Sequence, residues 1–275
     1  MDILSLATNI YKSEDGIWKT SDSEKISYTE KGHTLIKESE IKSFWFHHRL
    51  KCFSIIFKNY PVNFVLDIGG GNGRVSKFLQ SIDVEPVLIE PRAEGAYNAI
   101  QIGVRNVVHG SLFSAGIKSS SVPAVAIFDV LEHIEDDEKF LHELNRILEP
   151  GGKLFLSVPA YQFLYSGFDE EVGHFRRYTH RDLKRKLNTC GFVINYSTYF
   201  FSILPLAIFI VRLFYKIIKA RKKRREIGHI NKKSVFGSII KVLFAPEFFF
   251  IKRNMRIPFG SSCLVVANKR YQNGK

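Results

Sequence analysis

The sequence predicts an α/β fold in which helices cover both faces of a doubly wound, mostly parallel β-sheet. Two observations support this prediction. Short apolar runs alternate with helix-like stretches from residue 61 to residue 198, and the first apolar run ends in a group of glycines. Such runs are typical of parallel strands that are buried on both faces. The 275 residues, 45% of them hydrophobic, suffice for one such domain with additional segments.

Residues 1–60 are expected to form a helical cap before the sheet. Apolar residues recur at nearly helical spacing in the stretch 38–60, and Pro61 predicts its end. We interpret Trp45 and Phe46 as packing residues of this helix. The first residues, MDILSLATNIYKSEDG, have neither a basic flank nor a long apolar core, so we expect no secretory signal. Three widely separated cysteines without a C-x-x-C pair fit a reducing cytosol.

The predicted sheet domain comprises residues 61–198 together with 258–270. Its expected strands are 63–68, 85–90, 106–109, 123–130, 153–158, 192–201 and a last strand within PFGSSCLVVANK (258–269). The acidic first turn of 135–148 favours a helix, and a second helix is expected to begin after Thr179 and to end at Gly191. Residues 199–257 are then an apolar and basic helical insertion before the last strand.

The most specific local motif is VLDIGGGNG at residues 65–73. Glycines at the carboxyl edge of a parallel sheet let the backbone approach a ligand closely. Dinucleotide-binding loops also use glycines. Counted from the first or the third glycine here, however, the place of their last glycine holds Arg74 or Ser76. The acidic Asp67, two residues before the first glycine, is more typical of methyltransferases.

Glu90 ends the next strand, 17 residues after Gly73. A carboxylate at this point can accept hydrogen bonds from both hydroxyls of a ribose. The alternative is a solvated glutamate at a strand end. Because Glu90 follows the glycine loop at this spacing, ribose binding is the favoured interpretation.

These two motifs are followed by IFDVLEHI (127–134) and LEPGGKLFLSVP (148–159). In this order and spacing, the chain resembles the class I S-adenosylmethionine-dependent methyltransferases over roughly residues 40–200 and the last strand. The resemblance implies a seven-stranded, Rossmann-like sheet with an antiparallel last strand, and S-adenosylmethionine as the cofactor. The implied cofactor contacts are Asp67, Gly69 and Gly71 for the methionine part, Glu90 for the ribose, Ser111 and Leu112 for the adenine, and Asp129 and Val130 beside the reacting centre.

One methyltransferase subgroup shares two further phrases with this chain, FWFHHR (44–49) and GHFRRYT (173–179). Arg49 in the first phrase is interpreted either as a partner of the cofactor carboxylate or as a surface residue. In the second phrase, one arginine is expected to hold a phosphate or carboxylate while the other supports the fold. The predicted substrate-binding residues are Arg176, Arg177 and Tyr178.

Two histidines are candidates for the general base that a hydroxyl acceptor needs, because the pKa of histidine lies near neutrality. His174 lies in the loop after the fifth strand and is the better candidate. His133, at the end of the fourth strand, is more simply explained as a packing residue beside the cofactor. Asp129, Glu132 and His133 also resemble the metal ligands of some quinone-forming methyltransferases. We predict no metal here, because the spacing is loose and hard cations need more oxygen ligands.

The net charge of +13 is concentrated in one segment. Residues 212–256 hold 14 basic and two acidic residues, beside the uncharged run 199–211. A helical span needs about 20 apolar residues, so this run is short for a membrane crossing. We expect instead peripheral contact with an anionic membrane at its cytoplasmic face, with KARKKRR (219–225) on the headgroups. The alternative is a water-exposed lid over the substrate site.

The sequence therefore predicts methyl transfer to a small-molecule or lipid-linked acceptor, with oxygen expected as the acceptor atom and nitrogen or carbon left open. The basic charge suggests a nucleic-acid methyltransferase as an alternative. Residues 129–132 (DVLE) disfavour it, because they lack the Asn/Asp-Pro-Pro-aromatic motif of DNA amino-methylating enzymes. A non-catalytic membrane adaptor is a third possibility, and a dehydrogenase a fourth.

Overall fold

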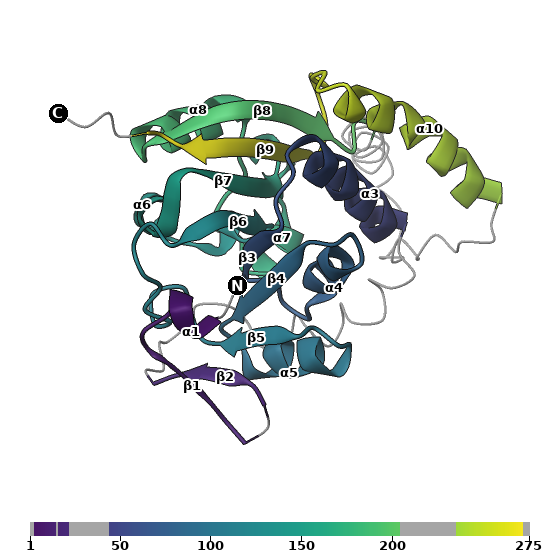
Figure 1. Ribbon diagram of the computed structural model, residues 1–275. Coiled ribbons are helices and arrows are strands. Elements are labelled where there is room, and N and C mark those ends of the chain that lie inside the picture. Colours follow the sequence, from purple (N-terminus) through teal and green to yellow (C-terminus); the bar gives the residue numbers. More distant parts are fainter. Residues whose placement is uncertain (1–2, 15, 22–43, 204–234, 272–275) are drawn as a thin grey trace.

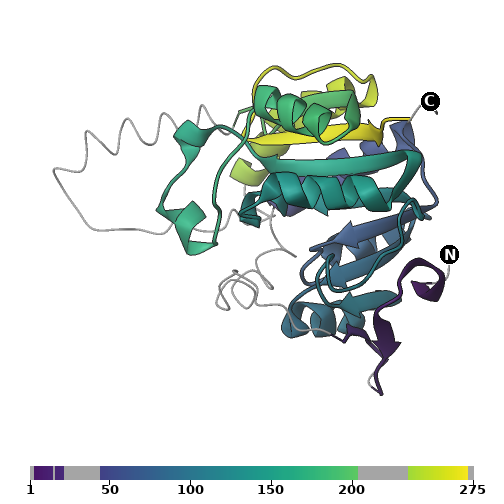
Figure 2. The same cartoon turned by 90° about the vertical axis from the view of Figure 1, so that its left-hand side faces the viewer.

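The computed structural model describes residues 3–14, 16–21, 44–203 and 235–271. Within these ranges the chain folds around one nine-stranded sheet, in the order β1-β2-β5-β4-β3-β6-β7-β9-β8 (Figure 1). The predicted α/β class and mostly parallel sheet are confirmed. Helices cover both faces of the sheet, as the doubly wound prediction requires (Figure 2).

The central strands follow the predicted apolar runs closely. They are β3 (Phe64–Ile68), β4 (Glu85–Glu90), β5 (Asn106–His109), β6 (Val122–Phe128) and β7 (Leu148–Pro159), all parallel to one another. Every residue of β3 is buried, which explains why its sequence is apolar without alternation.

The last two strands complete the sheet beside β7. β9 (Ser262–Lys269) lies between β7 and β8 (Phe192–Phe200) and is antiparallel to both. The antiparallel last strand is therefore confirmed. Because β9 opposes both neighbours, β8 runs in the same direction as β7, and both end at the same edge of the sheet.

The strand number differs from the predicted seven because the N-terminal residues add two strands. β1 (Ile10–Lys12) and β2 (Trp18–Thr20) form a hairpin, and β2 pairs in parallel with β5. The expectation of an all-helical region before residue 60 is therefore wrong for this hairpin. Only the short α1 (Ile3–Leu6) and α3 (Phe44–Asn59) are helical among the described residues before residue 60. The division into cap, sheet domain and insertion stays a prediction.

Two layers of helices enclose the sheet. On one face, α3 packs with α4 (Arg74–Gln80) and with α10 (Val235–Lys252), and α5 (Ala93–Gln101) covers β4 and β5. On the other face lie α1, α6 (Asp137–Ile147) and α8 (His180–Thr189). Thr179 caps α8 by accepting a hydrogen bond from the backbone of Asp182, as predicted, and Gly191 follows its end with φ +83°.

Three short helices lie in the loops at the carboxyl ends of β6 and β7. They are η1 (Leu131–His133), η2 (Gln162–Leu164) and α7 (Gly167–Glu171). No helix in the described ranges is long and apolar enough to cross a membrane. The basic stretch 219–225 and most of the uncharged run 199–211 lie outside those ranges.

Candidate active site

The glycine loop after β3 adopts a backbone that only glycine tolerates easily. Gly69 and Gly71 have φ of +71° and +57°, in the left-handed region. A Cβ on Gly69 would stand 2.8 Å from Cγ2 of Val130, so Val130 packs directly over the loop. A Cβ on Gly73 would stand 2.5 Å from that of Ala99 on α5. The loop is therefore closely packed against Val130 and α5, while Gly69 and Gly71 stay partly exposed.

Asp67 lies beneath this loop rather than at its surface. Its carboxylate accepts a 2.5 Å hydrogen bond from the hydroxyl of Ser76 on α4, and a Cβ on Gly70 would stand 2.7 Å from the same oxygen. Burial raises the pKa of Asp67 to about 6, although the Ser76 bond lowers it. The structure thus gives Asp67 a supporting position under the glycines, and a contact with the methionine part stays a prediction.

Glu90 joins the loop to the end of β4. One carboxylate oxygen accepts a hydrogen bond of 2.8 Å from the backbone N–H of Gly71, and the other accepts one of 3.0 Å from that of Arg92. Burial raises the pKa of Glu90 to about 7, and these two hydrogen bonds act against the shift. Glu90 is therefore a buried carboxyl group beside the loop, and the ribose contact, which would use the second lone pair of each oxygen, stays a prediction.

The loop after β5, predicted to border the adenine, is fixed by small hydroxyl side chains. Ser111 and Ser114 exchange hydrogen bonds, and Oγ of Ser114 lies 3.2 Å from Oγ1 of Thr20 on β2. Leu112 is buried in the core. The N-terminal hairpin thus borders this loop through Thr20, which the sequence did not indicate because residues 1–60 were expected to be helical.

Asp129 follows β6 and is held in a strained conformation. Its φ is +56°, and its carboxylate accepts a hydrogen bond of 3.1 Å from Ser157. The guanidinium of Arg49 on α3 lies 2.6 Å from its other oxygen. Arg49 is therefore partly buried and paired with Asp129, while its Nε has no hydrogen-bond partner among the described residues, and a contact with the cofactor carboxylate stays a prediction. Together Asp129 and Val130 line the side of the glycine loop, where the resemblance placed the reacting centre.

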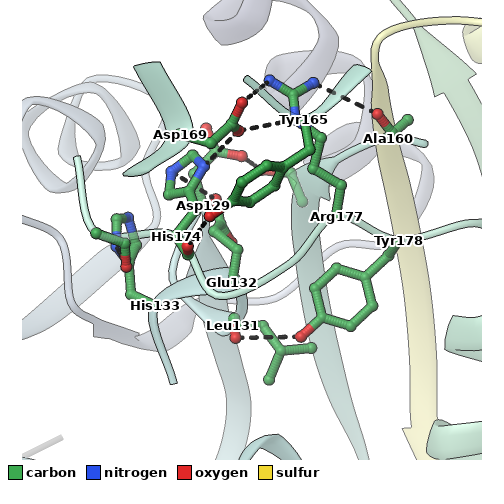
Figure 3. A network of polar contacts seen from close by, with 12 residues as sticks. Asp129, Leu131, Glu132, His133, Ala160, Tyr165, Asp169, His174, Arg177 and Tyr178 are labelled. Atoms are coloured by element: carbon green, nitrogen blue, oxygen red, sulfur yellow. Dashed lines mark hydrogen bonds and ion pairs between the residues drawn. The ribbon is translucent and has the colours of Figure 1, made fainter. Parts of the chain in front are cut away.

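His174 is held by a charged network (Figure 3). Its Nδ1 lies 2.8 Å from Oδ1 of the buried Asp169, and Arg177 donates to both oxygens of that carboxylate, at 2.8 and 3.0 Å. Burial alone would raise the pKa of Asp169, but the hydrogen bonds from Arg177 and His174 lower it overall. An ionised Asp169 accepts a hydrogen bond from Nδ1–H, and in the neutral ring with its proton on Nδ1 the lone pair is on Nε2.

Glu132 lies opposite this nitrogen, with Oε1 4.0 Å from Nε2 of His174. Its side chain is fully buried, and neither oxygen has a hydrogen-bond partner among the residues that the structure describes. Burial, with the charge of Asp129, raises the pKa of Glu132 well above its usual value. A buried carboxyl group without partners is costly, and here it faces a basic nitrogen at the carboxyl edge of the sheet.

His133 lies beside His174, with ring centroids 4.6 Å apart (Figure 3). Its Nδ1 is 3.2 Å from the carbonyl of Gly173. Burial, with His174 nearby, lowers the pKa of His133 to about 3, so this ring is neutral and weakly basic at physiological pH. The geometry therefore favours His174 over His133 as a base. Glu132, His133 and His174 also form a group whose ligand atoms lie within 4.8 Å of one another.

The three predicted substrate residues have partners inside the protein. Arg177 binds Asp169, Arg176 binds Asp137 at 3.1 Å, and the hydroxyl of Tyr178 donates to Asp137 at 2.8 Å. Tyr178 is only 1% exposed. The structure thus corrects the expectation for Tyr178, because burial leaves its hydroxyl no open side. Both guanidinium groups bind internal carboxylates, and the predicted division between a ligand-holding and a supporting arginine stays a prediction.

The residues around the glycine loop fit S-adenosylmethionine. The loop presents backbone without side chains where a Cβ would meet Val130, and the carboxylate of Glu90 is buried at its side. The positive φ angles of Gly69 and Gly71 exclude most other residues from this cradle. Gly69, Gly71 and Glu90 would hold the cofactor, which supplies an electrophilic methyl group on a sulfonium.

Comparison with known proteins agrees with this class of site. A family described as a methyltransferase domain matches residues 39–196, which is more than half of the chain. The chain therefore belongs to this methyltransferase family. The predictions of a methyltransferase domain and of S-adenosylmethionine as its cofactor are confirmed.

Individual relatives are more distant. The ubiquinone biosynthesis O-methyltransferase of Xanthomonas oryzae pv. oryzae (strain PXO99A) is 34% identical over 102 residues, which are 34% of this chain and 42% of the relative. A probable S-adenosylmethionine-dependent methyltransferase of Mycolicibacterium smegmatis is 25% identical over 156 residues, covering 56% of this chain and 61% of the relative. The chain thus spans less than two thirds of either protein.

Solved structures show the same fold. Phosphoethanolamine N-methyltransferase 2 of Haemonchus contortus, in complex with S-adenosyl-L-methionine, superposes with a TM-score of 0.55. Its identity is 16%, over 88% of this chain and 57% of that one. At this identity the similarity concerns the fold alone.

Sequence reasoning missed four residues that shape the site. Ser76 was noted only as a poor substitute for glycine, and Thr20 lies in a hairpin that was expected to be helical. Glu132 was considered only as a possible metal ligand, and Asp169 was given no role. One signal in the sequence could have identified Asp169. Ser166 and Asp169 have the spacing of a capping box, which fixes the carboxylate of Asp169 at the start of α7, near His174.

Proposed function

We propose that the protein methylates a hydroxyl group of a small-molecule or lipid-linked acceptor, with His174 as the general base. The observation that carries this proposal is the arrangement of Asp169, His174 and Glu132. With the proton of the ring on Nδ1, Nε2 of His174 is an acceptor, and it lies 4.0 Å from Oε1 of the buried Glu132. The xanthomonad relative, whose name describes O-methylation in ubiquinone biosynthesis, supports oxygen as the acceptor atom.

The residues of the chain have distinct roles in the proposed reaction. Arg177 holds Asp169, and Asp169 accepts a hydrogen bond from the Nδ1–H of His174, which fixes the tautomer of the ring. An acceptor hydroxyl would donate a hydrogen bond to Nε2 and pass its proton to that nitrogen, while the new bond from its oxygen to the methyl carbon would replace the methyl–sulfur bond of the cofactor. The imidazolium that forms lies against Asp169, whose ionised carboxylate stabilises the new positive charge.

Methyl transfer is an in-line displacement, so alignment and exclusion of water supply much of the acceleration. The loop glycines Gly69 and Gly71, with Val130 and Asp129, would provide that alignment. The acceptor is proposed to meet the enzyme at the cytoplasmic face of a membrane, because 12 of the 13 net positive charges fall in residues 212–256.

A two-step experiment tests this proposal. Calorimetric titration with S-adenosylhomocysteine, with NADH as the control ligand, is expected to show binding of the first compound alone. Tritium from methyl-labelled S-adenosylmethionine is then followed into prenylated phenols and into their aniline analogues. We expect label on the phenols, and for His174→Asn a loss of kcat of about 10²–10⁴-fold with unchanged affinity for S-adenosylhomocysteine.

Two results would overturn the proposal. Label found only on the anilines would show that the acceptor atom is nitrogen. Full activity of His174→Asn toward the phenols would show that His174 is not the general base.

A further inference from the structure

The C-terminal half of α10 exposes an apolar row that the fold does not use. Leu243 and Phe249 are 49% and 51% exposed, and the exposed Pro246 lies between them on the same side of the helix. The opposite side buries Phe244 and Ile251 in the core against α3. Met255, just after the helix, is a further exposed apolar side chain at 44%.

Basic side chains end this apolar row, and no acidic side chain interrupts it. Lys252, Arg253 and Arg256 are exposed, and the guanidinium of Arg253 lies 4.5 Å from the ring centroid of Phe249. The one acidic residue between positions 243 and 260 is Glu247, which is buried. We call the set Leu243, Pro246, Phe249, Lys252, Arg253, Met255 and Arg256 the α10 surface.

Glu247 anchors this surface to the edge of the sheet where the candidate active site lies. It accepts hydrogen bonds from the backbone N–H groups of Phe201 and Ser202 at the carboxyl end of β8, at 3.0 and 2.6 Å. It also lies 2.8 Å from Nε2 of His48 on α3. The next residue of α3, Arg49, binds Asp129 at the end of β6. One helix thus contacts both α10 and the site.

We propose that the α10 surface docks on an anionic lipid bilayer, with the helix lying in the plane of the interface. A row of apolar side chains bordered by lysine and arginine fits such an interface, because the apolar groups enter the headgroup boundary while the cations bind lipid phosphates. Charge complementarity selects an anionic membrane: the surface carries three cations and no exposed anion.

The proposal rests on the proposed function in one respect, the delivery of a lipid-linked acceptor. β7 and β8 end at the same edge of the sheet, so docking through α10 brings the bilayer to the edge that carries His174 and Asp129. A lipid-linked acceptor would then reach the site without leaving the membrane.

Fluorescence of the full chain with Phe249→Trp tests the docking directly. Vesicles of phosphatidylglycerol and phosphatidylcholine are expected to shift the emission of this tryptophan to the blue, relative to the parent protein, and brominated lipid should quench it. Tyr97→Trp, which replaces an exposed aromatic residue on α5, is the matched control and should do neither.

Sedimentation with the same vesicles tests the charges. Lys252→Glu with Arg253→Glu is expected to weaken partition at least tenfold, whereas Lys184→Glu with Arg185→Glu, the same charge change on exposed positions of α8, should have a much smaller effect. Pure phosphatidylcholine vesicles should bind the parent protein weakly.

Each other outcome has a defined meaning. Equal partition of the two double variants to vesicles, with no shift in the emission of the tryptophan at position 249, would overturn the proposed docking. A blue shift of the emission of this tryptophan on addition of S-adenosylhomocysteine, but not on addition of vesicles, would also overturn the proposal, because it would show that the α10 surface covers the candidate active site. Because the α10 variants should bind S-adenosylhomocysteine and methylate a water-soluble phenol as the parent does, failure of docking is distinguishable from failure of the proposed reaction.

Discussion

The two halves of the candidate site are built by different means. The glycine-loop half, from Asp67 to Ser76 with Glu90, is shaped by backbone geometry: positive φ angles, close packing, and a carboxylate bound to backbone N–H groups. The histidine half, from Asp129 to His133 with Asp169 to Arg177, is shaped by contacts between charged side chains.

Because of this difference, the two halves tolerate different substitutions. A backbone cradle depends on the absence of a side chain, so it fails when any Cβ is added. A charged network depends on each group being satisfied by a particular partner, so it fails when one charge is removed. The following predictions test the two halves separately.

The largest expected effect is in the histidine half. Asp169→Asn removes the charge that holds the tautomer of His174, and an asparagine can present its amide N–H to the ring instead. We expect kcat for the phenol acceptor to fall about 10²–10³-fold, with unchanged affinity for S-adenosylhomocysteine. Glu170→Gln, an exposed neighbour on α7, is the control. A fall in cofactor affinity instead of kcat would show that the two halves are not separate.

The next effect concerns the glycine-loop half. Gly69→Ala places a Cβ 2.8 Å from Cγ2 of Val130 on a residue with φ +71°. We expect calorimetry to show affinity for S-adenosylhomocysteine reduced about 10–100-fold. Gly16→Ala has a similar φ of +81° with no atom within 4 Å of the new Cβ, and it should leave the affinity unchanged. Equal losses in both variants would attribute the effect to backbone strain rather than to the cradle.

The smallest effect concerns stability. Burial raises the pKa of Glu90 to about 7 from 4.5, so the folded protein binds this proton more tightly than the unfolded chain does. The contribution of Glu90 to stability is fully present below pH 4.5 and is lost as the pH rises through 7. In Glu90→Gln, the fall in unfolding free energy between pH 5 and pH 8 should be smaller by ~2 kcal/mol. Thermal unfolding at both pH values measures this.

Glu94→Gln, at an exposed position in the first turn of α5, is the control for Glu90→Gln and should retain the pH dependence of the parent. If Glu90→Gln behaved like this control, the carboxylate of Glu90 would be ionised throughout this pH range in the folded protein.

The same contrast explains how far the sequence predicted the molecule. The parallel strands and the glycine loop were predictable because apolar runs and glycines constrain the backbone locally. The N-terminal hairpin was not, because Trp18 and Lys19 pair with Val108 and His109, about 90 residues away in the sequence. Pairing over such a distance leaves no periodic signal in a three-residue strand.

The histidine half was predicted only as a set of residue types. His174 was identified as a candidate base, but its orientation depends on Asp169 and Arg177 choosing each other as partners. Arg176 and Arg177 looked equally able to hold a ligand, and the fold pairs each with an internal carboxylate. Sequence spacing does not decide such pairings, because several carboxylates lie within reach of each arginine.

The position of β9 has a consequence for synthesis of the protein. β9 follows β7 and β8 in the sequence but lies between them in the sheet. While the chain is being made, β7 can pair with β6, but neither β7 nor β8 can pair with β9 until residues 262–269 have left the ribosome. The nascent protein therefore carries two unpaired strand edges for the whole time in which residues 201–261 are translated. A translational pause in this interval would prolong the exposure of these edges, and a stop before Ser262 would leave a gap inside the sheet rather than a shorter edge.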